Sequence, residues 1–144
     1  MLKGFATSAY YAADLKAAEA WYSEVLGIDA YFHVPGYIEF RVGPYEAELG
    51  IIDAQYAPEG GNVAGGGYVQ WAVDDVAATL AHLLELGATL YQPVIERGGG
   101  FNTAAVVDPF GNILGFMENP HFEEIVATGT PAGGVRPVGE ARTH

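Results

Sequence analysis

The 144-residue sequence contains no cysteine, few basic residues and no long hydrophobic run. Without cysteine, the chain has no disulfide, no thiolate metal ligand and no cysteine nucleophile. Six Lys and Arg residues against 18 Asp and Glu give a formal net charge of −12. This charge argues against nucleic acid as a partner, because phosphate contacts require clustered basic side chains. No apolar run approaches the ~20 residues that span a bilayer, so no membrane partner is predicted.

The remaining composition is that of one globular domain. Half of the residues are hydrophobic and 17% are charged, which distinguishes the chain from a disordered one. The first four residues lack the features of a signal peptide, and together with the missing cysteines this predicts a cytoplasmic protein. The acidity suits a cationic ligand, which a negative potential attracts, and it equally suits a protein that is merely kept in solution.

The chain contains an internal repeat. A β-prone run ends in Asp14 in the first half and in Asp75 in the second, and a helical pattern of apolar residues follows each Asp. Both carboxylates are suited to accept the free N–H groups of a helix's first turn. Gly27 and Gly87 stand where a left-handed residue ends a helix. Each half therefore begins with a strand and a capped helix.

The second parts of the two halves also correspond. Gly43-Pro44 and Asp108-Pro109 each open a turn, with Pro at a position where its fixed φ suits a hairpin, and a strand follows each. Residues 37–42 alternate between apolar and polar side chains, which predicts a half-buried strand. Residues 102–107 are its counterpart in the second half. Each half therefore has the order βαβββ, and the predicted fold class is α+β with two tandem modules.

These elements give the predicted organisation of the chain. One domain covers residues 1–129, and its parts are module one (5–53), a linker (54–66), module two (67–118) and a short C-terminal helix (119–129). Asn119 is suited to cap that helix, with Pro120 at its first position and Gly129 at its end. Residues 130–144 are rich in Gly and Pro, and we expect a flexible tail or a segment that covers a partner subunit.

The repeat and three motifs resemble the vicinal oxygen chelate superfamily of glyoxalases, bleomycin-resistance and fosfomycin-resistance proteins and extradiol dioxygenases. The motifs are an Asp that opens each helix, Trp21-Tyr22 ahead of Val25-Leu26-Gly27, and Asp108-Pro109-Phe110-Gly111-Asn112. The resemblance covers about residues 5 to 118. It implies a cupped mixed sheet with helices outside, a ligand in the cup, and a homodimer whose modules pair within one chain or between chains.

The resemblance also implies where metal-dependent members hold their metal ligands. Those positions here are Thr7 and Tyr68 near the start of each module, and Gly50 and Gly115 near its end. None of the four supplies the imidazole or carboxylate that a divalent metal needs. We therefore predict no metal and no cofactor, and we expect the two glycines to leave space in the cup.

A rebuilt metal site is the alternative, and it would draw on other donors. His33 lies near the second strand of module one and could reach the cup. Glu118 and His121 are close together at the start of the C-terminal helix. Strand alternation places Glu118 on the opposite face from Gly115, unless the register slips.

Alternation also predicts which side chains line the cup, whereas Tyr10 and Trp71 are predicted to face the helices. The predicted ligand-binding residues are Thr7, Tyr11, Tyr37, Glu39, Arg41, Glu48, Gly50, Tyr68, Gln70, Gly115 and Met117. Tyrosine rings with Glu39 and Glu48 suit an organic ligand with an aromatic or cationic part. Alternatively, Glu39 and Arg41 form a structural ion pair and the tyrosines only fill the barrel.

The predicted function is a protein that sequesters a small organic ligand without a metal, as the resemblance to the bleomycin-resistance branch implies. The alternative is a lyase, isomerase or dioxygenase-like enzyme that uses a metal site rebuilt around His33, Glu48 or Glu118, or carboxylate acid–base chemistry. A third possibility is a dimeric protein-interaction module, whose cup would be filled with side chains.

Overall fold

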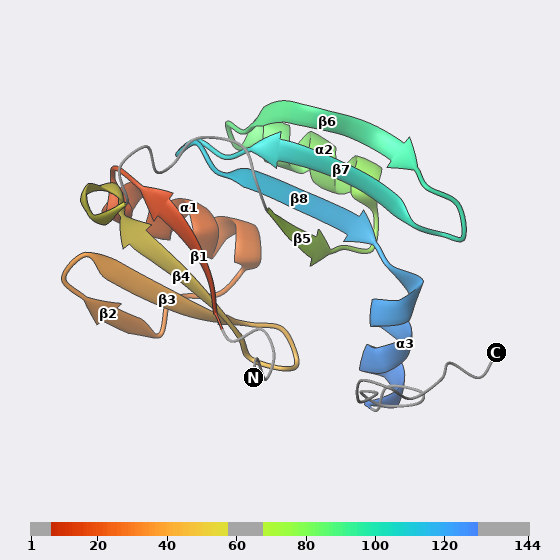
Figure 1. The fold of residues 1–144 in the computed structure, drawn as a ribbon, viewed down its shortest axis with the longest axis horizontal. Coiled ribbons are helices and arrows are strands. Elements are labelled where there is room, and N and C mark those ends of the chain that lie inside the picture. The colour runs from red at the N-terminus through yellow and green to blue at the C-terminus, as the bar shows by residue number, and fades with distance from the viewer. Residues whose placement is uncertain (1–6, 58–67, 130–144) are drawn as a thin grey trace, which may run out of the picture.

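The structure, a computed structural model, describes residues 7–57 and 68–129 and contains two βαβββ modules (Figure 1). Module one comprises β1 (Thr7–Ala12), α1 (Leu15–Leu26), β2 (Phe32–Val34), β3 (Tyr37–Val42) and β4 (Ala47–Asp53). Module two comprises β5 (Val69–Ala72), α2 (Val76–Glu85), β6 (Thr89–Glu96), β7 (Asn102–Val107) and β8 (Ile113–Glu118). A 3-10 turn, η1 (Ala54–Tyr56), follows β4, and α3 (Pro120–Thr128) follows β8. The predicted α+β fold of two tandem modules is confirmed.

Two predicted segments lie wholly or mostly outside the residues that the structure describes. The tail at 130–144 lies outside the described residues, as does most of the linker at 54–66. Within the described part of the chain, no helix is long and apolar enough to cross a membrane.

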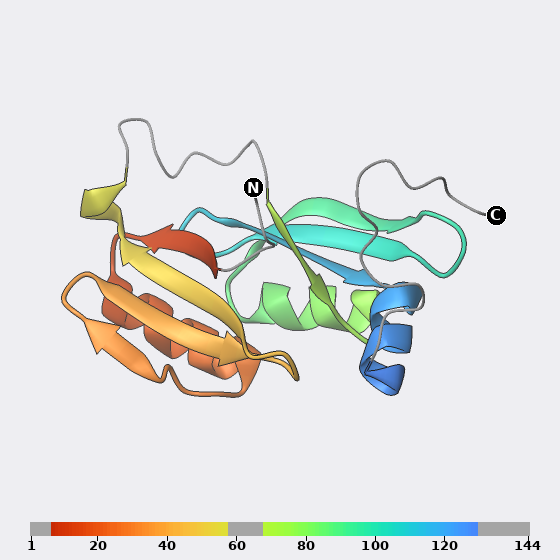
Figure 2. The same cartoon turned by 60° about the horizontal axis from the view of Figure 1, so that its bottom comes forward.

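Each module forms its own four-stranded mixed sheet. The strand orders are β1-β4-β3-β2 and β5-β8-β7-β6. β1 pairs with β4 and β5 with β8 in parallel, whereas the other neighbours are antiparallel. In each module the first strand is parallel to the last, and the helix lies between the first and second strands along the chain. α1 packs on β3 and β4, and α2 packs on β6, β7 and β8 (Figures 1 and 2).

The helices begin at the predicted caps. The Asp14 carboxylate accepts the Ala17 N–H and the Asp75 carboxylate accepts the Ala78 N–H, both at 3.0 Å. Gly27 ends α1 in the left-handed region, with φ of 68°, where a side chain would be strained. Local chemistry therefore sets both helix starts.

The core lies between each sheet and its helix. Apolar side chains on the helix-facing side of the strands are buried: Tyr10, Ile38, Phe40, Leu49, Ile51, Ala104, Val106, Leu114 and Phe116. The Trp71 indole packs against this core and donates to the Tyr10 hydroxyl at 3.1 Å, which confirms the helix-facing side predicted for both residues. The opposite side of each sheet carries no helix of its own module, and we call it the open face.

A buried carboxylate joins the two modules. Asp108 Oδ2 accepts hydrogen bonds from the Tyr22 hydroxyl (2.5 Å) and from Asn112 Nδ2 (3.0 Å). Asp108 Oδ1 accepts the N–H groups of Phe110 (2.9 Å) and Asn112 (2.8 Å). The Asn112 amide in turn pairs with both backbone groups of Tyr11 in β1, at 2.8 and 3.2 Å. The turn that precedes β8 thus holds α1 and β1 of the other module.

Trp21 adds a second contact between the modules. Its indole N–H donates to the Leu86 carbonyl at 2.9 Å, and its ring meets Phe110 edge-on at 6.2 Å. Burial, reinforced by the negative charge of Asp108, raises the pKa of Tyr22 far above its ordinary value. The Tyr22 hydroxyl therefore keeps its proton and remains a donor to Asp108.

We predict that Tyr22→Phe lowers the free energy of unfolding by about 1–3 kcal/mol, because a buried carboxylate oxygen loses its hydroxyl partner. Urea unfolding followed by circular dichroism measures the change. Tyr91→Phe is the matched control: this side chain is 50% exposed, and the change should stay within about 0.5 kcal/mol. Equal unfolding midpoints for Tyr22→Phe and the unmodified protein would contradict the assignment.

Candidate functional site

The register of the first sheet brings seven of the predicted site residues onto its open face. Thr7 lies opposite Glu48, which lies opposite Arg41. Gly50 lies opposite Glu39 in the same way. The residues on this face are Thr7, Tyr11, Tyr37, Glu39, Arg41, Glu48 and Gly50. Alternation along the strands therefore predicted their common face.

The β2–β3 side of this open face carries an acidic–aromatic cluster, formed by Tyr31, Phe32, Tyr37, Glu39 and Arg41. The Glu39 carboxylate accepts hydrogen bonds from the Tyr37 hydroxyl (2.6 Å) and from the Tyr31 hydroxyl. The Phe32 ring lies 6.3 Å from Tyr31 and 6.4 Å from Tyr37, measured between ring centroids. Three aromatic rings thus gather beside one carboxylate.

Two members of this cluster, Tyr31 and Phe32, were not among the predicted site residues. The available signal was the short β2–β3 hairpin, whose register places Phe32 opposite Glu39. The Tyr31 N–H also donates to the Glu39 carbonyl at 3.1 Å. A hairpin predicted from the sequence with this register would have placed both rings beside Glu39.

Arg41 contacts an aromatic ring rather than a carboxylate. Its guanidinium carbon lies 4.4 Å from the centroid of the Tyr31 ring, within the range of a cation–π contact. Within residues 7–57 and 68–129, the one ion pair joins His33 to Glu19. The expected alternative of a Glu39–Arg41 ion pair is therefore not formed.

Two carboxylates shape the electrostatics of this face. Partial desolvation, together with the nearby charge of Glu48, raises the pKa of Glu39, and Arg41 opposes the shift. Partial desolvation and the charge of Glu48 also raise the pKa of Tyr37. Glu48 Oε2 accepts a hydrogen bond from the Thr7 hydroxyl at 2.8 Å. This face thus holds two neighbouring carboxylates and one basic side chain, Arg41.

The expected space at the two glycines is not there, because neighbouring side chains fill it. A Cβ atom at Gly50 would lie 2.5 Å from the Tyr37 hydroxyl. One at Gly115 would lie 2.8 Å from Gln70 Oε1 and 2.8 Å from the Tyr68 ring. The reason is the pleat: Tyr37 in β3 is a diagonal neighbour of Gly50, and Tyr68, just before β5, is a diagonal neighbour of Gly115. Long side chains reach diagonally.

These positions do not fit a divalent metal ion. Carboxylates at Gly50 and Gly115 would collide with the side chains described above, and Thr7 and Tyr68 offer only hydroxyl groups, which are poor ligands for such an ion. In the described part of the chain, no three His, Asp or Glu side chains come together as a metal site.

The donors considered for a rebuilt metal site do not come together as a set of three in the described part of the chain. His33 is paired with the core residue Ile38 and so faces α1, where its Nε2 lies 2.5 Å from Glu19 Oε1; it does not reach the open face. Glu118 accepts the Val76 N–H at the start of α2 at 3.1 Å, which is the face that alternation predicted. His121 is exposed in the first turn of α3.

The remaining predicted residues form a separate group on the second sheet. Gln70 lies opposite Gly115 in the parallel β5–β8 pair, and Met117 lies two residues further along the same face. Tyr68 directly precedes β5 and is 41% exposed. The Met117 sulfur is within 3.7 Å of Asn119 Nδ2. This group contains no charged residue, so the acidic character belongs to module one.

Known proteins share both the sequence pattern and the fold. The model of the Glyoxalase/Bleomycin resistance protein/Dioxygenase superfamily matches residues 4–116. A glyoxalase-related enzyme from Fulvimarina pelagi is 23% identical, with a TM-score of 0.68 over 83% of this chain and 91% of that one. A lactoylglutathione lyase from Agrobacterium tumefaciens is 26% identical, with a TM-score of 0.63 over 83% and 96%. No curated protein matches the chain.

We predict that Glu48→Gln lowers the pKa of Glu39 and that Arg41→Gln raises it further, because the first change removes a like charge and the second an opposite one. The pH titration of the Glu39 carboxyl carbon by NMR measures both. Glu24→Gln, an exposed position on α1, removes the same charge and should leave the Glu39 midpoint in place. Shifts of the same sign in the first two variants would contradict the assignment.

Proposed function

Because the chain belongs to the glyoxalase/bleomycin resistance protein/dioxygenase superfamily, we propose that it binds a small organic molecule without a metal ion. The ligand bears a positive charge beside an aromatic or apolar part. It lies on the open face of the first sheet, against the acidic–aromatic cluster. The protein sequesters this molecule rather than transforming it.

One observation carries this proposal: the group above Gly50 is the Tyr37 hydroxyl, bonded to the Glu39 carboxylate. A tyrosine–glutamate pair attracts an organic cation, through the carboxylate charge and the ring face. The cluster already accommodates one planar cation, because the Arg41 guanidinium stacks on Tyr31. The net charge of −12 adds long-range attraction for a cation.

We further propose that the site is completed in a homodimer. Tyr31, Phe32 and Val34 are 44–45% exposed, and they lie at the edge formed by β2. Large apolar side chains grouped on a surface favour contact with a partner. A second copy placed over this edge would remove water from the acidic–aromatic cluster and strengthen its attraction for a cation.

An enzyme that uses carboxylate acid–base chemistry is the second candidate, and the raised pKa of Glu39 favours it. The likeness to a lactoylglutathione lyase is consistent with a catalytic relative on this fold. The two functions differ in turnover: a sequestering protein returns its ligand unchanged, whereas an enzyme with Glu39 as its base would release a product, and Glu39→Gln would abolish that release.

We predict that phenyltrimethylammonium binds the protein in the presence of EDTA and that Glu39→Gln weakens this binding about tenfold, because one charge contact is lost. Isothermal titration calorimetry at low salt measures the affinity. Tyr31→Leu should weaken binding to a similar extent through the lost ring face, while Glu24→Gln should not. Binding that requires added Zn²⁺, or equal affinity of Glu39→Gln and the unmodified protein, would contradict the proposal.

A further inference from the structure

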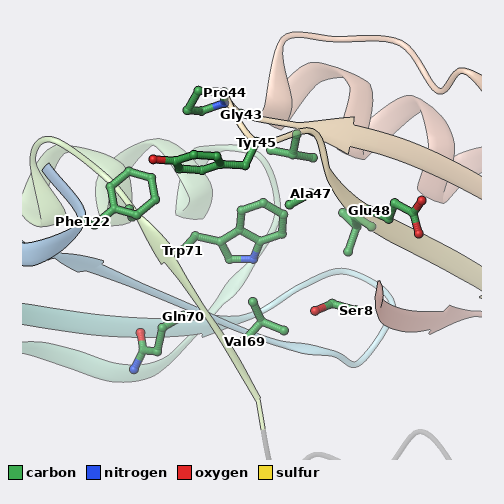
Figure 3. Close-up of a pocket in the computed structure, with 13 residues that line it drawn as sticks. Ser8, Gly43, Pro44, Tyr45, Ala47, Glu48, Val69, Gln70, Trp71 and Phe122 are labelled. Carbon is green, nitrogen blue, oxygen red and sulfur yellow. The ribbon is translucent and has the colours of Figure 1, made fainter. Parts of the chain in front are cut away.

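We propose that a cleft between the two modules is a second ligand site, which takes a planar aromatic cation. The cleft lies between the edge strand β5 and the turn that joins β3 to β4, beside the start of β1 (Figure 3). Its volume is about 320 Å³, at the lower end of the range for small-molecule sites. Its walls are distinct from the acidic–aromatic cluster.

Three aromatic side chains from separate elements surround this cleft. Tyr45 comes from the β3–β4 turn, Trp71 from β5 and Phe122 from α3, and their rings gather around the same space (Figure 3). Tyr45 is 58% exposed and Phe122 is 38% exposed. Val69 and Leu49 continue the apolar lining. Flat ring faces left in contact with solvent are suited to cover a planar aromatic molecule.

The aromatic walls are held in position by hydrogen bonds. The Trp71 indole donates to the Tyr10 hydroxyl at 3.1 Å, which fixes the plane of its ring. The Phe122 N–H donates to the capping Asn119 side chain at 3.0 Å. The Tyr45 hydroxyl donates to the Ile125 carbonyl at 3.3 Å, so the turn of module one is tied to α3. Because these side chains are already ordered, a ligand that binds between them pays a smaller entropic cost.

The turn that presents Tyr45 has an unusual backbone. Glu46 has φ of +51° and is the one non-glycine residue with positive φ in the described part of the chain. Gly43, at the other end of the turn, has φ of +73°. Such conformations cost free energy outside glycine and tend to occur where structure positions a functional group. Here the strained turn places Tyr45 at the mouth of the cleft.

The charge around the cleft selects the ligand's sign. Among the described residues that line it, Glu48 is the one charged side chain, and none is basic. Its carboxylate lies at the edge of the cleft toward β1, away from the three rings (Figure 3). The aromatic body of the ligand therefore lies between the rings, and its positively charged edge faces Glu48.

The test uses three planar probes of similar shape: N-methylacridinium (cationic), acridine (uncharged at pH 8) and acridine-9-carboxylate (anionic). The two tryptophans give two indole N–H signals in an NMR spectrum. We expect N-methylacridinium to shift the Trp71 signal and to leave that of Trp21, which is bonded to Leu86, in place. The anionic probe should bind at least tenfold more weakly than the cationic one.

Variants separate the aromatic walls from the charge. Phe122→Ala should weaken acridine and N-methylacridinium alike, by about tenfold, whereas Tyr91→Ala, an exposed ring on β6, should weaken neither. Glu48→Gln should weaken N-methylacridinium about tenfold and leave acridine unchanged, with Glu24→Gln as the charge-matched control. A Trp71 signal that does not respond to either acridine or N-methylacridinium overturns the proposal, as does equal response of both indoles. Neither result depends on Glu39, so the proposal for the cleft and the proposal for the open face can be refuted independently.

Discussion

The buried carboxylate of Asp108 is the contact on which the arrangement of the two modules depends. It accepts four hydrogen bonds, including that of Tyr22 from the other module, and the turn it stabilises presents Asn112 to the backbone of β1. A buried carboxylate is unfavourable unless its oxygens are satisfied. The placement of α1 against the turn satisfies them, so this network ties the first module to the second.

Both candidate sites follow from this placement. Fixing β1 beside the second module aligns the edge strand β5 with the β3–β4 turn, and the cleft lies between them. On the other side of the first sheet, the acidic–aromatic cluster is left without a covering helix. Glu48 belongs to the open face and also lines the cleft. Glu48 is therefore a carboxylate that both candidate sites share.

Much of the fold was predictable because its signals are local. The caps Asp14 and Asp75 start their helices through bonds three residues away, and the alternation in 37–42 fixed which side chains share a face. The contents of that face were less predictable. Tyr37 fills the space above Gly50 by reaching diagonally between strands, and His33 turns to Glu19 on a helix. The cleft depends on how three elements that are distant in the sequence pack together: the turn with Tyr45, the strand with Trp71 and the helix with Phe122. The periodicity of a single segment does not predict such packing.

Native mass spectrometry tests the central claim most directly, namely that this fold holds an organic ligand without a divalent metal. The protein would be produced with Zn²⁺, Ni²⁺ and Mn²⁺ supplied in the medium and purified without chelators. We predict the mass of two chains, with an organic adduct or none, and no mass increment from a metal. A dimer that carries one divalent ion per chain, retained on dilution, would contradict it, because Tyr37, Tyr68 and Gln70 would then have to leave the positions they fill.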